Sequence, residues 1–475
     1  MEEQIQFRSS VQVAVNDDPP AVQVDGEGFY ASRFTGKTAV ILAGLICEGC
    51  FSRNEIIRVA EERHGVIPFS TMMFLADLDK INALQVCMSF EDPELTFVVD
   101  ETKCSDQLNG KPEDDSTLYV ASRFHLTRFD GHEWIVESAH GDGRIRSRTP
   151  QPLNLLGLFS EPRSLQSVVD THSGSVREWS RSLCQALVSV RILVQPESEE
   201  QAALRLWDFH DLLFQSRSRI GRTINPGLRL FRFKEDPGIP PLPKERPFEG
   251  TRMPLCRDDT CSHEASRPLR QVMQSRRSAT QFPESGLTVE QLGRFLDRCN
   301  GNVPVPESAK AVQASNRFLG NGKYDFVKKI YPSAGGIYEL ELFLVVQQCE
   351  GIDSGLYYHD ANSHELVLIR SMDASLRHLT ELQAVQGSMP GVLIMLASRF
   401  GRLSYKYESF AYSLTLRNAG VLTAYLYLIA EDMGLSGCAY GTGNAEWFTR
   451  LTNTNWYEYA YVSDFGLGAG NKERE

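Results

Sequence analysis

Three stretches in the C-terminal part of the chain decide the fold: RRSATQF (Arg276 to Phe282), YPSAGGIYELELFLVV (Tyr331 to Val346) and SYKYESFAYSLTLRNAG (Ser404 to Gly420). They occur in this order within about 220 residues, which is the size of one domain. The first joins two arginines to a hydroxyl, the second places a glycine-rich turn before an apolar strand, and the third leads into a long apolar helix. The sequence therefore predicts a domain that binds a flat, anionic ligand.

The composition bounds the class of protein. The chain has 475 residues, of which 42% are hydrophobic and 23% charged, so a packed globular protein is expected. Its net charge of −12 argues against nucleic-acid binding, which needs a basic face. The longest apolar run, Ala39 to Cys47, is far below the ~20 residues that span a bilayer. The polar start MEEQIQFRSS does not resemble a secretion signal, which predicts a soluble, cytoplasmic protein without a membrane partner.

The cysteines predict reduced thiols rather than a disulfide framework. Ten cysteines are scattered along the chain, and no secretion signal accompanies them. Two short clusters, CEGC (Cys47, Cys50) and CRDDTCSH (Cys256, Cys261, His263), could begin a zinc site. Neither is followed by the second ligand pair that a structural zinc site usually needs, so we predict no metal.

The N-terminal part reads as a duplication over residues 1–105 and 106–200. ASRF occurs at Ala31 to Phe34 and again at Ala121 to Phe124, and short helical patterns follow both copies. The copies end in LTFVVD (Leu95 to Asp100) and VRILVQ (Val190 to Gln195). This order, a strand followed by three short helices and then further strands, is typical of a winged-helix domain. Such a pair could bind DNA, bind a peptide along a sheet edge or serve as structural support; the shortage of basic residues makes DNA the least favoured.

Residues 201–255 read as a connector between this duplication and a third domain at 256–475. A helical pattern, LRLWDFHDLLF (Leu204 to Phe214), leads into an arginine cluster at Arg217, Arg219 and Arg222. The proline-rich stretch DPGIPPLPKERPFEG follows, and this composition excludes helix and central strand. We expect an extended strap there.

Two motifs of the third domain suit a phosphorylated cofactor. Arg276, Arg277 and Ser278 offer guanidinium groups and a hydroxyl, which bind a phosphate monoester well. The loop Pro-Ser-Ala-Gly-Gly lets backbone approach a flat ligand closely, and its serine can donate to that ligand. The residues of this loop are Pro332, Ser333, Ala334, Gly335 and Gly336.

Regular elements are predicted around these motifs. A T-x-x-Q capping box, Thr288 and Gln291, starts a helix with an apolar stripe. GLYYHD and ELVLIR form a predicted hairpin, and GVLIMLA (Gly391 to Ala397) a buried strand. From Phe410 to Met433 the chain is apolar nearly all round, which predicts a helix buried in a core or a subunit interface.

The motifs together resemble the nitroreductase fold, and more narrowly its SagB-type azoline dehydrogenases, including cyanobactin oxidases, which make thiazoles and oxazoles in ribosomal peptides. The resemblance implies an α+β protein with a C-terminal FMN domain preceded by two winged-helix-like domains. RRS resembles the FMN-phosphate motif RRSxRxF, with Thr280 in place of its next arginine; Arg417 and Arg450 are candidate replacements. PSAGG and the loop CAYGTG, with Tyr440 and Gly441, would lie near the flavin.

The resemblance also implies a reaction. Lys406 and Tyr407 match the Lys-Tyr pair of the family, while Asn418 and Val421 stand where relatives often carry an acid and a histidine. Azoline oxidation removes a proton from one carbon and a hydride from its neighbour; FMN takes the hydride and a base takes the proton. Either a tyrosine whose pKa is lowered by the lysine or the lysine itself could be that base.

The expected substrate is an azoline-containing peptide, with molecular oxygen as electron acceptor and a homodimer as the active form. Two alternatives remain open. One is an NAD(P)H-dependent nitroreductase that needs no peptide, and the other is a peptide-binding scaffold without catalysis.

Overall fold

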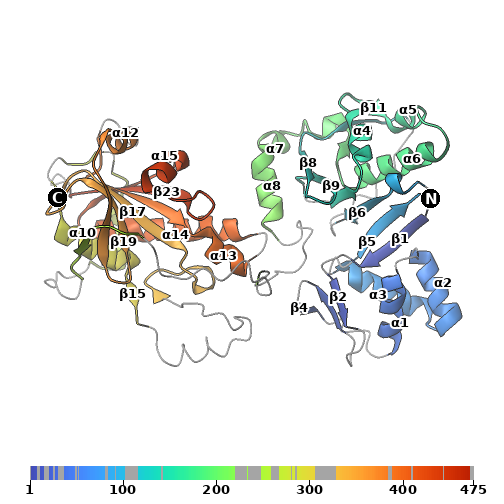
Figure 1. The fold of residues 1–475 in the computed structure, drawn as a ribbon, viewed down its shortest axis with the longest axis horizontal. Coiled ribbons are helices and arrows are strands. Elements are labelled where there is room, and N and C mark those ends of the chain that lie inside the picture. Colours follow the sequence, from blue (N-terminus) through green and yellow to red (C-terminus); the bar gives the residue numbers. More distant parts are fainter. Residues whose placement is uncertain are drawn as a thin grey trace. The chain divides into compact units, whose positions relative to one another are not determined.

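In the computed structural model the chain divides into two compact units, Met1–Arg229 and Leu230–Glu475 (Figure 1). The structure describes residues 2–7, 11–14, 21–24, 27–29, 37–48, 51, 53–80, 84–90, 92–101, 116–140, 143–219, 233, 248–257, 267–279, 281–283, 286–304, 328–382, 388–407, 410–441 and 443–470. The predicted proline-rich strap lies almost wholly outside these residues, as do Thr280, Cys50, Cys261 and His263. Within the described ranges, no helix has the length and apolarity to cross a bilayer.

The first unit contains two sets of three helices, in the order that the duplication predicts. The first set is α1 (Lys37–Glu48), α2 (Arg53–His64) and α3 (Pro68–Lys80), and the second is α4 (Gln151–Gly157), α5 (Leu165–Val169) and α6 (Gly174–Ser189). Each set buries an apolar cluster of its own, around Leu42 and Phe74 in one case and around Trp179 and Leu183 in the other. The winged-helix assignment itself stays a prediction.

One antiparallel sheet joins the two copies. Its strand order is β1-β5-β6-β10-β9-β8, and β6 of the first copy pairs with β10 of the second. The strands are β1 (Glu2–Phe7), β5 (Leu84–Ser89), β6 (Phe97–Glu101), β8 (His125–Phe129), β9 (Trp134–Ser138) and β10 (Gly143–Ser147). Smaller sheets contain β2 (Val11–Ala14), β3 (Ala21–Val24) and β4 (Glu27–Phe29), and β7 (Leu118–Ala121), β11 (Arg163–Ser164) and β12 (Leu193–Val194).

Charge pairs cover part of this sheet. Asp100, fully buried, accepts hydrogen bonds from Arg144 (2.7 Å) and Arg146 (3.0 Å). Two more helices, α7 (Ala202–Arg205) and α8 (Phe209–Arg217), belong to the same unit. Arg217 of α8 contacts Glu137 of β9 at 2.9 Å, so one arginine of the connector is held against the sheet.

The second unit is built on a seven-stranded antiparallel sheet of order β13-β20-β19-β17-β21-β23-β22. The strands are β13 (Arg252–Pro254), β17 (Leu340–Val346), β19 (Gly355–Asp360), β20 (Glu365–Ser371), β21 (Val392–Ser398), β22 (Ser436–Tyr440) and β23 (Ala460–Gly468). The predicted hairpin and buried strand are therefore present. Short pairs are formed by β14 (Leu287–Thr288) with β18 (Cys349–Glu350), and by β15 (Asn302–Val303) with β16 (Lys328–Lys329).

Helices cover both faces of this sheet. The long helix α14 (Ala411–Asp432) and α10 (Val289–Asn300) pack on one face, and α10 starts with the predicted Thr288–Gln291 capping box. The other face carries α12 (Ala374–Leu382) and α15 (Ala445–Thr452). Two shorter helices, α9 (Leu269–Ser275) and α13 (Phe400–Lys406), lie against α14. This mixed architecture confirms the expected α+β class.

Candidate active site

The predicted site residues form two clusters on α14. The first, called the lysine cluster, contains the loop Pro332–Gly336, Lys406, Tyr407 and Asn418. The second, called the arginine cluster, contains Arg276, Ser278, Tyr427 and Ala439. The adjacent Arg277 is counted with it, although its guanidinium donates to the Gln274 and Arg276 carbonyls at 2.9 Å each. Asn418 and Tyr427 are nine residues apart on the helix, which corresponds to about 14 Å along its axis. One chain therefore brings the predicted residues to two places rather than one.

Lys406 and Tyr407 lie at the end of a short helix that the sequence did not predict. Lys406 is the last residue of α13, and Tyr407 leaves the helix with an extended backbone. A Cβ built on Gly335 would lie 2.5 Å from the Tyr407 hydroxyl and 2.8 Å from Lys406 Nζ. Both polar ends are thus packed directly against the glycine-rich loop, and the ammonium group lies 5.1 Å from the Tyr407 ring centroid.

Burial sets the protonation preferences of this pair. Desolvation lowers the pKa of the Lys406 amine and raises the pKa of the Tyr407 phenol. The expectation that the lysine charge lowers the tyrosine pKa is therefore wrong in direction, because loss of water is the dominant cause. The free amine of Lys406 becomes more accessible near neutral pH, while Tyr407 remains a protonated hydroxyl that can donate a hydrogen bond.

The glycine-rich loop is held in place from α14. The Asn418 side chain accepts a hydrogen bond from the Ala334 N–H (3.1 Å) and donates one to the Ser333 hydroxyl (3.2 Å). Gly335 and Gly336 have φ values of 61° and 66°, in the left-handed region that favours glycine. The loop is therefore a fixed turn whose conformation requires the two glycines of the motif.

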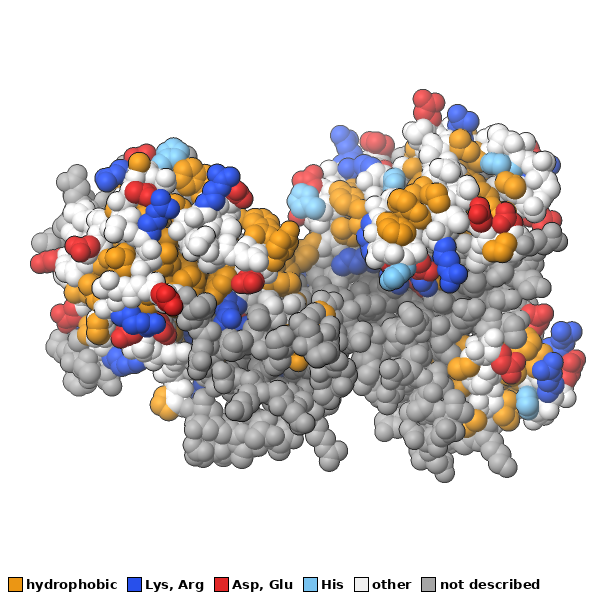
Figure 2. Space-filling view, in the orientation of Figure 1, with side chains coloured by type: hydrophobic (Ala, Val, Ile, Leu, Met, Phe, Trp, Pro, Cys, Tyr) orange, Lys and Arg blue, Asp and Glu red, His pale blue; other side chains and the backbone are white. Residues whose placement is uncertain are grey.

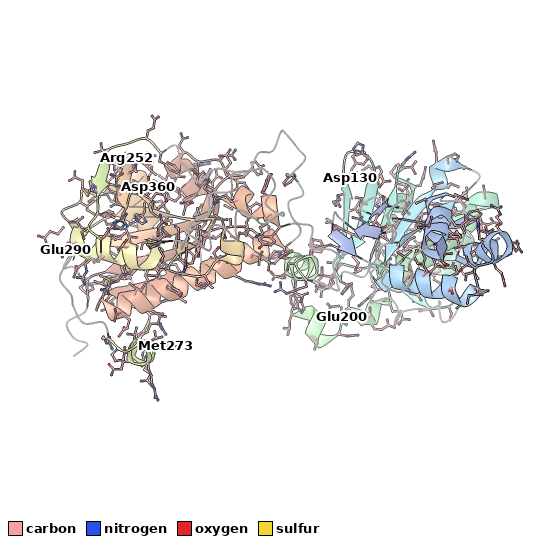
Figure 3. The ribbon with its side chains drawn as sticks, turned by 90° about the horizontal axis from the view of Figure 1, so that it is seen from below. Asp130, Glu200, Arg252, Met273, Glu290 and Asp360 are labelled. Atoms are coloured by element: carbon pink, nitrogen blue, oxygen red, sulfur yellow. The ribbon has the colours of Figure 1, made fainter. Side chains whose placement is uncertain are left out.

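Tyr427 connects the residues of the arginine cluster, although in the sequence it is only an aromatic residue in a predicted apolar helix. Its hydroxyl accepts a hydrogen bond from the Ala439 N–H (2.8 Å) and lies 3.0 Å from the Ser278 hydroxyl. The Arg276 guanidinium stands over its ring at 5.0 Å from the centroid, a cation–π arrangement. Figure 3 shows α9, marked by Met273, beside α14. The end of α9 thereby brings Arg276, Arg277 and Ser278 to this part of the helix.

The other candidate residues lie in different surroundings. Tyr440 ends β22 and Gly441 follows it, so the predicted flavin loop begins as a strand directly after Ala439. Arg417 is exposed on α14. Arg450 is exposed on α15 and pairs with Glu446 at 2.8 Å. Among the described residues, neither arginine is found in contact with the arginine cluster, and Thr280 lies outside them, so the replacement for the missing arginine stays open.

We expect Tyr427→Phe to weaken FMN binding about tenfold, since loss of a hydroxyl that bridges two groups costs about 1–1.5 kcal/mol. The measurement is a flavin-quenching titration. Tyr425→Phe is the matched control, because Tyr425 lies on the same helix but faces the Tyr331 ring, with centroids 6.3 Å apart. Equal affinities for the two variants would contradict the role given to Tyr427.

A buried carboxyl lies next to the start of the predicted flavin loop. Asp464 on β23 is cross-strand from Tyr440 and only 2% exposed, and Tyr461 also faces it. Among the described residues, neither Asp464 Oδ1 nor the Tyr440 hydroxyl has a hydrogen-bond partner. Burial raises the pKa of Asp464 from its ordinary value of 3.8 to about 7. The group is thus kept mainly protonated below neutral pH.

This raised pKa predicts a pH-dependent stability. The folded protein holds the Asp464 proton more tightly than the unfolded chain, so its contribution is complete below pH 3.8 and is lost as the pH rises through about 7. Asp464→Asn is expected to raise the free energy of unfolding at pH 8 by a few kcal/mol, an amount that follows from the size of the pKa shift. At pH 4 it should change the free energy of unfolding little. Urea unfolding at both pH values checks this; the same difference at each pH would contradict it.

The described residues on the face that Figure 2 shows do not form the basic surface that nucleic-acid binding needs. Figure 2 shows positive and negative side chains interspersed over the described part of each unit, with no continuous basic area on the face in view. Several arginines are already paired with acids; Arg252, for example, contacts Asp360 at 3.4 Å and Glu365 at 2.9 Å. Figure 3 shows Arg252 and Asp360 side by side at the edge of the second unit.

Comparison with known families assigns a segment of each unit. Residues 119–224 match the sequence model of the cyanobactin oxidase ThcOx family. Residues 273–465 match that of the nitroreductase family, and this range contains every candidate site residue. A protein of Methanocaldococcus jannaschii, named as a candidate nitroreductase, is 24% identical over 176 residues, which are 36% of this chain and 78% of that protein.

Solved structures show the same likeness at a coarse level. A nitroreductase-type protein from Anabaena variabilis has 21% identity and a TM-score of 0.34; the match covers 43% of this chain and only 38% of that one. The Escherichia coli microcin synthetase McbBCD complex with truncated pro-MccB17 bound has 18% identity and a TM-score of 0.34, covering 51% of this chain and 88% of that one. A Desulfovibrio desulfuricans nitroreductase-type protein in complex with FMN has 12% identity and a TM-score of 0.28, covering 44% and 89%.

Proposed function

Because the chain joins a segment of the cyanobactin oxidase family to a nitroreductase-family domain, the combination of a SagB-type oxidase, we propose that it is an FMN-dependent enzyme that oxidises azolines to azoles in a ribosomally made peptide. The coarser assignment, a flavin-dependent peptide-modifying oxidase, rests on the two family matches. The finer reaction rests on the lysine cluster.

The observation that carries the finer reaction is the packing of Lys406 and Tyr407 against Gly335. A half-buried amine whose pKa is lowered by desolvation is suited to accept a proton from carbon. A protonated tyrosine beside it can hold an azoline nitrogen or a peptide carbonyl by donating a hydrogen bond. We assign Lys406 as the base and Tyr407 as the residue that orients the substrate.

The residues of the arginine cluster suit an FMN phosphate. Arg276 and Ser278 provide a guanidinium group and a hydroxyl at one place, donors that a phosphate monoester takes. Arg277 is the next residue in the chain, and its guanidinium donates to the Gln274 and Arg276 carbonyls. Cβ atoms built on Gly336 and Gly441 would meet no atom within 4 Å, so a flat ring can approach the backbone at both positions. When bound, FMN would supply the hydride acceptor for the reaction.

The separation of the two clusters supports a homodimer as the active form. A single flavin site needs both clusters, but they lie about 14 Å apart on one helix. Near the lysine cluster, α14 presents Tyr412 and Leu416, each 40% exposed, which is unusual for large apolar side chains on a central helix. We propose that a second copy covers this part of α14 and brings its arginine cluster to the lysine cluster.

We assign the first unit to peptide binding. Its six-stranded sheet ends in β8, whose outer edge lacks a neighbouring strand within the described part of the unit. An extended peptide can add to such an edge through main-chain hydrogen bonds. Phe129 at the end of β8 is 52% exposed and packs against Trp134, which provides an apolar contact for a peptide side chain. Purely structural support is the competing interpretation.

An anaerobic flavin titration tests the proposal. Purified protein loaded with FMN is mixed with a thiazoline-containing peptide in one cell and with NADPH in another, and the visible flavin band is followed. Bleaching by the peptide alone, with recovery when oxygen is admitted, is the expected result. Bleaching by NADPH alone would indicate the nitroreductase alternative, and protein that takes up no FMN would indicate the peptide-binding scaffold.

A further inference from the structure

One buried carboxylate contacts both Asn418 and the glycine-rich loop of the lysine cluster. Glu339 is fully buried directly after the glycine-rich loop. Its two carboxylate oxygens accept hydrogen bonds from the Asn418 amide at 2.9 and 3.1 Å, and the Ser333 hydroxyl donates to it at 3.4 Å. Asn418 and Ser333 are the residues that fix the loop, so the carboxylate determines which way the amide of Asn418 faces.

The backbone of the same residue fixes α13. The Glu339 carbonyl accepts a hydrogen bond from the Arg399 N–H (2.9 Å), at the start of the helix that ends in Lys406. One turn further on, the Arg402 guanidinium donates to the Ile337 carbonyl (3.2 Å). Loop, α13 and α14 therefore converge on residues 337–339. Burial raises the pKa of the Glu339 carboxyl, and the hydrogen bonds from Asn418 and Ser333 and the Arg402 charge act in the opposite direction.

Burial of a charged carboxylate costs free energy unless the group is fully hydrogen-bonded. The partners of Glu339 should therefore show what its burial stabilises. The residues that donate hydrogen bonds to the carboxyl from other parts of the chain are Ser333 of the loop and Asn418, which holds the loop. The amide of Asn418 must point its oxygen at the Ala334 N–H and its nitrogen at the acid. An uncharged residue at position 339 would leave the Asn418 N–H groups without this carboxyl acceptor, and the Ala334 N–H would then be the main group that orients the amide.

We propose that Glu339 is a positioning residue for the lysine cluster: through Asn418 and Ser333 it fixes the loop so that Gly335 lies against Lys406 Nζ and the Tyr407 hydroxyl. The consequence for turnover rests on the proposed function above. The effect of Glu339 on the surroundings of the Lys406 amine does not depend on that proposed function. A misplacement on the scale of 1 Å at a reacting group can cost about 100-fold in rate.

The test compares Glu339→Gln, Asn418→Asp and the double swap Glu339→Gln with Asn418→Asp. In Glu339→Gln two amides face each other, and in Asn418→Asp two acids face each other. The double swap restores one acid and one amide, but the amide that donates is then at position 339 instead of position 418. Two readouts are made on FMN-loaded protein: kcat and KM for an azoline peptide, and the rate at which acetic anhydride labels Lys406, followed by mass spectrometry across pH. Thermal unfolding shows that each variant is folded.

In the single variants we expect kcat to fall about 10- to 100-fold with a smaller change in KM, and the Lys406 labelling rate to change several-fold. In the swap both should return to within about threefold of the wild type. Glu341→Gln is the matched control: it is a buried glutamate two residues away whose carboxylate contacts Tyr358 (3.0 Å), so its labelling rate should be that of the wild type.

The proposal is overturned if folded single variants label Lys406 at the wild-type rate, or if the folded swap restores neither readout. A wild-type protein that does not turn over the peptide would count against the proposed function alone. The labelling of Lys406 would then still decide the role of Glu339.

Discussion

Lys406→Ala abolishes turnover of an azoline peptide while FMN stays bound: this is the largest loss expected from a single side chain. General-base catalysis by a positioned group contributes about 10²- to 10⁴-fold, and the lysine cluster offers no second amine among the described residues. The groups assigned to the FMN phosphate belong to the arginine cluster and do not include Lys406, so flavin affinity should change less than about twofold. Steady-state turnover and a flavin titration on the same preparation measure both effects.

Further variants of Lys406 distinguish its ability to accept a proton from its positive charge. Lys406→Arg keeps a cation that does not release its proton near neutral pH, and it should be as inactive as the alanine variant. Small primary amines should restore part of the activity of Lys406→Ala only. In the wild type, kcat/KM should rise with pH through a pKa below the ordinary lysine value of 10.5, because burial lowers it. Full activity in Lys406→Arg would remove the lysine from the base role.

Gly335→Ala is expected to reduce turnover at least 100-fold. The new Cβ would lie 2.5 Å from the Tyr407 hydroxyl and 2.8 Å from Lys406 Nζ, closer than real carbon contacts allow, so both catalytic candidates must move. The residue also has a φ of 61°, where a side chain costs about 1–3 kcal/mol. Turnover and thermal unfolding measured together show how much of the loss is local.

Gly434, just after the end of α14, gives the control for backbone strain. It has almost the same φ, 65°, but a Cβ there would meet no atom within 4 Å. Gly434→Ala should therefore lose similar stability without displacing Lys406 or Tyr407. If the two variants lost turnover equally, the contact between Gly335 and the pair would not be what matters.

Much of the second unit could be predicted from the sequence, because its signals are local. The capping box at Thr288, the strands of the hairpin and the apolar run from Phe410 to Met433 each depend on residues close together in the chain. All three appear in the structure. The grouping of loop residues with Lys406 came from the family resemblance, not from spacing alone, and the two are in contact.

What could not be predicted depends on pairings between distant residues. In the sequence, Tyr427 is one aromatic residue of an apolar helix, and Glu339 is one residue before a strand. Their roles follow only from their contacts, of Tyr427 with Ser278 and of Glu339 with Asn418. The direction of the Tyr407 pKa also required the structure, because it depends on burial and not on the neighbouring letter. Nor did any pattern predict that Arg217 lies against a sheet.

The pairing of β6 with β10 has a consequence for how the chain can be divided. A protein cut between the two copies, near residue 110, would leave a row of unmatched amide and carbonyl groups on each fragment, where the strands now pair. Such newly bared edges associate with one another or with other chains. The two halves of the duplication should therefore be produced together, and a shortened chain that begins at the second copy is expected to aggregate rather than serve as a smaller version of the enzyme.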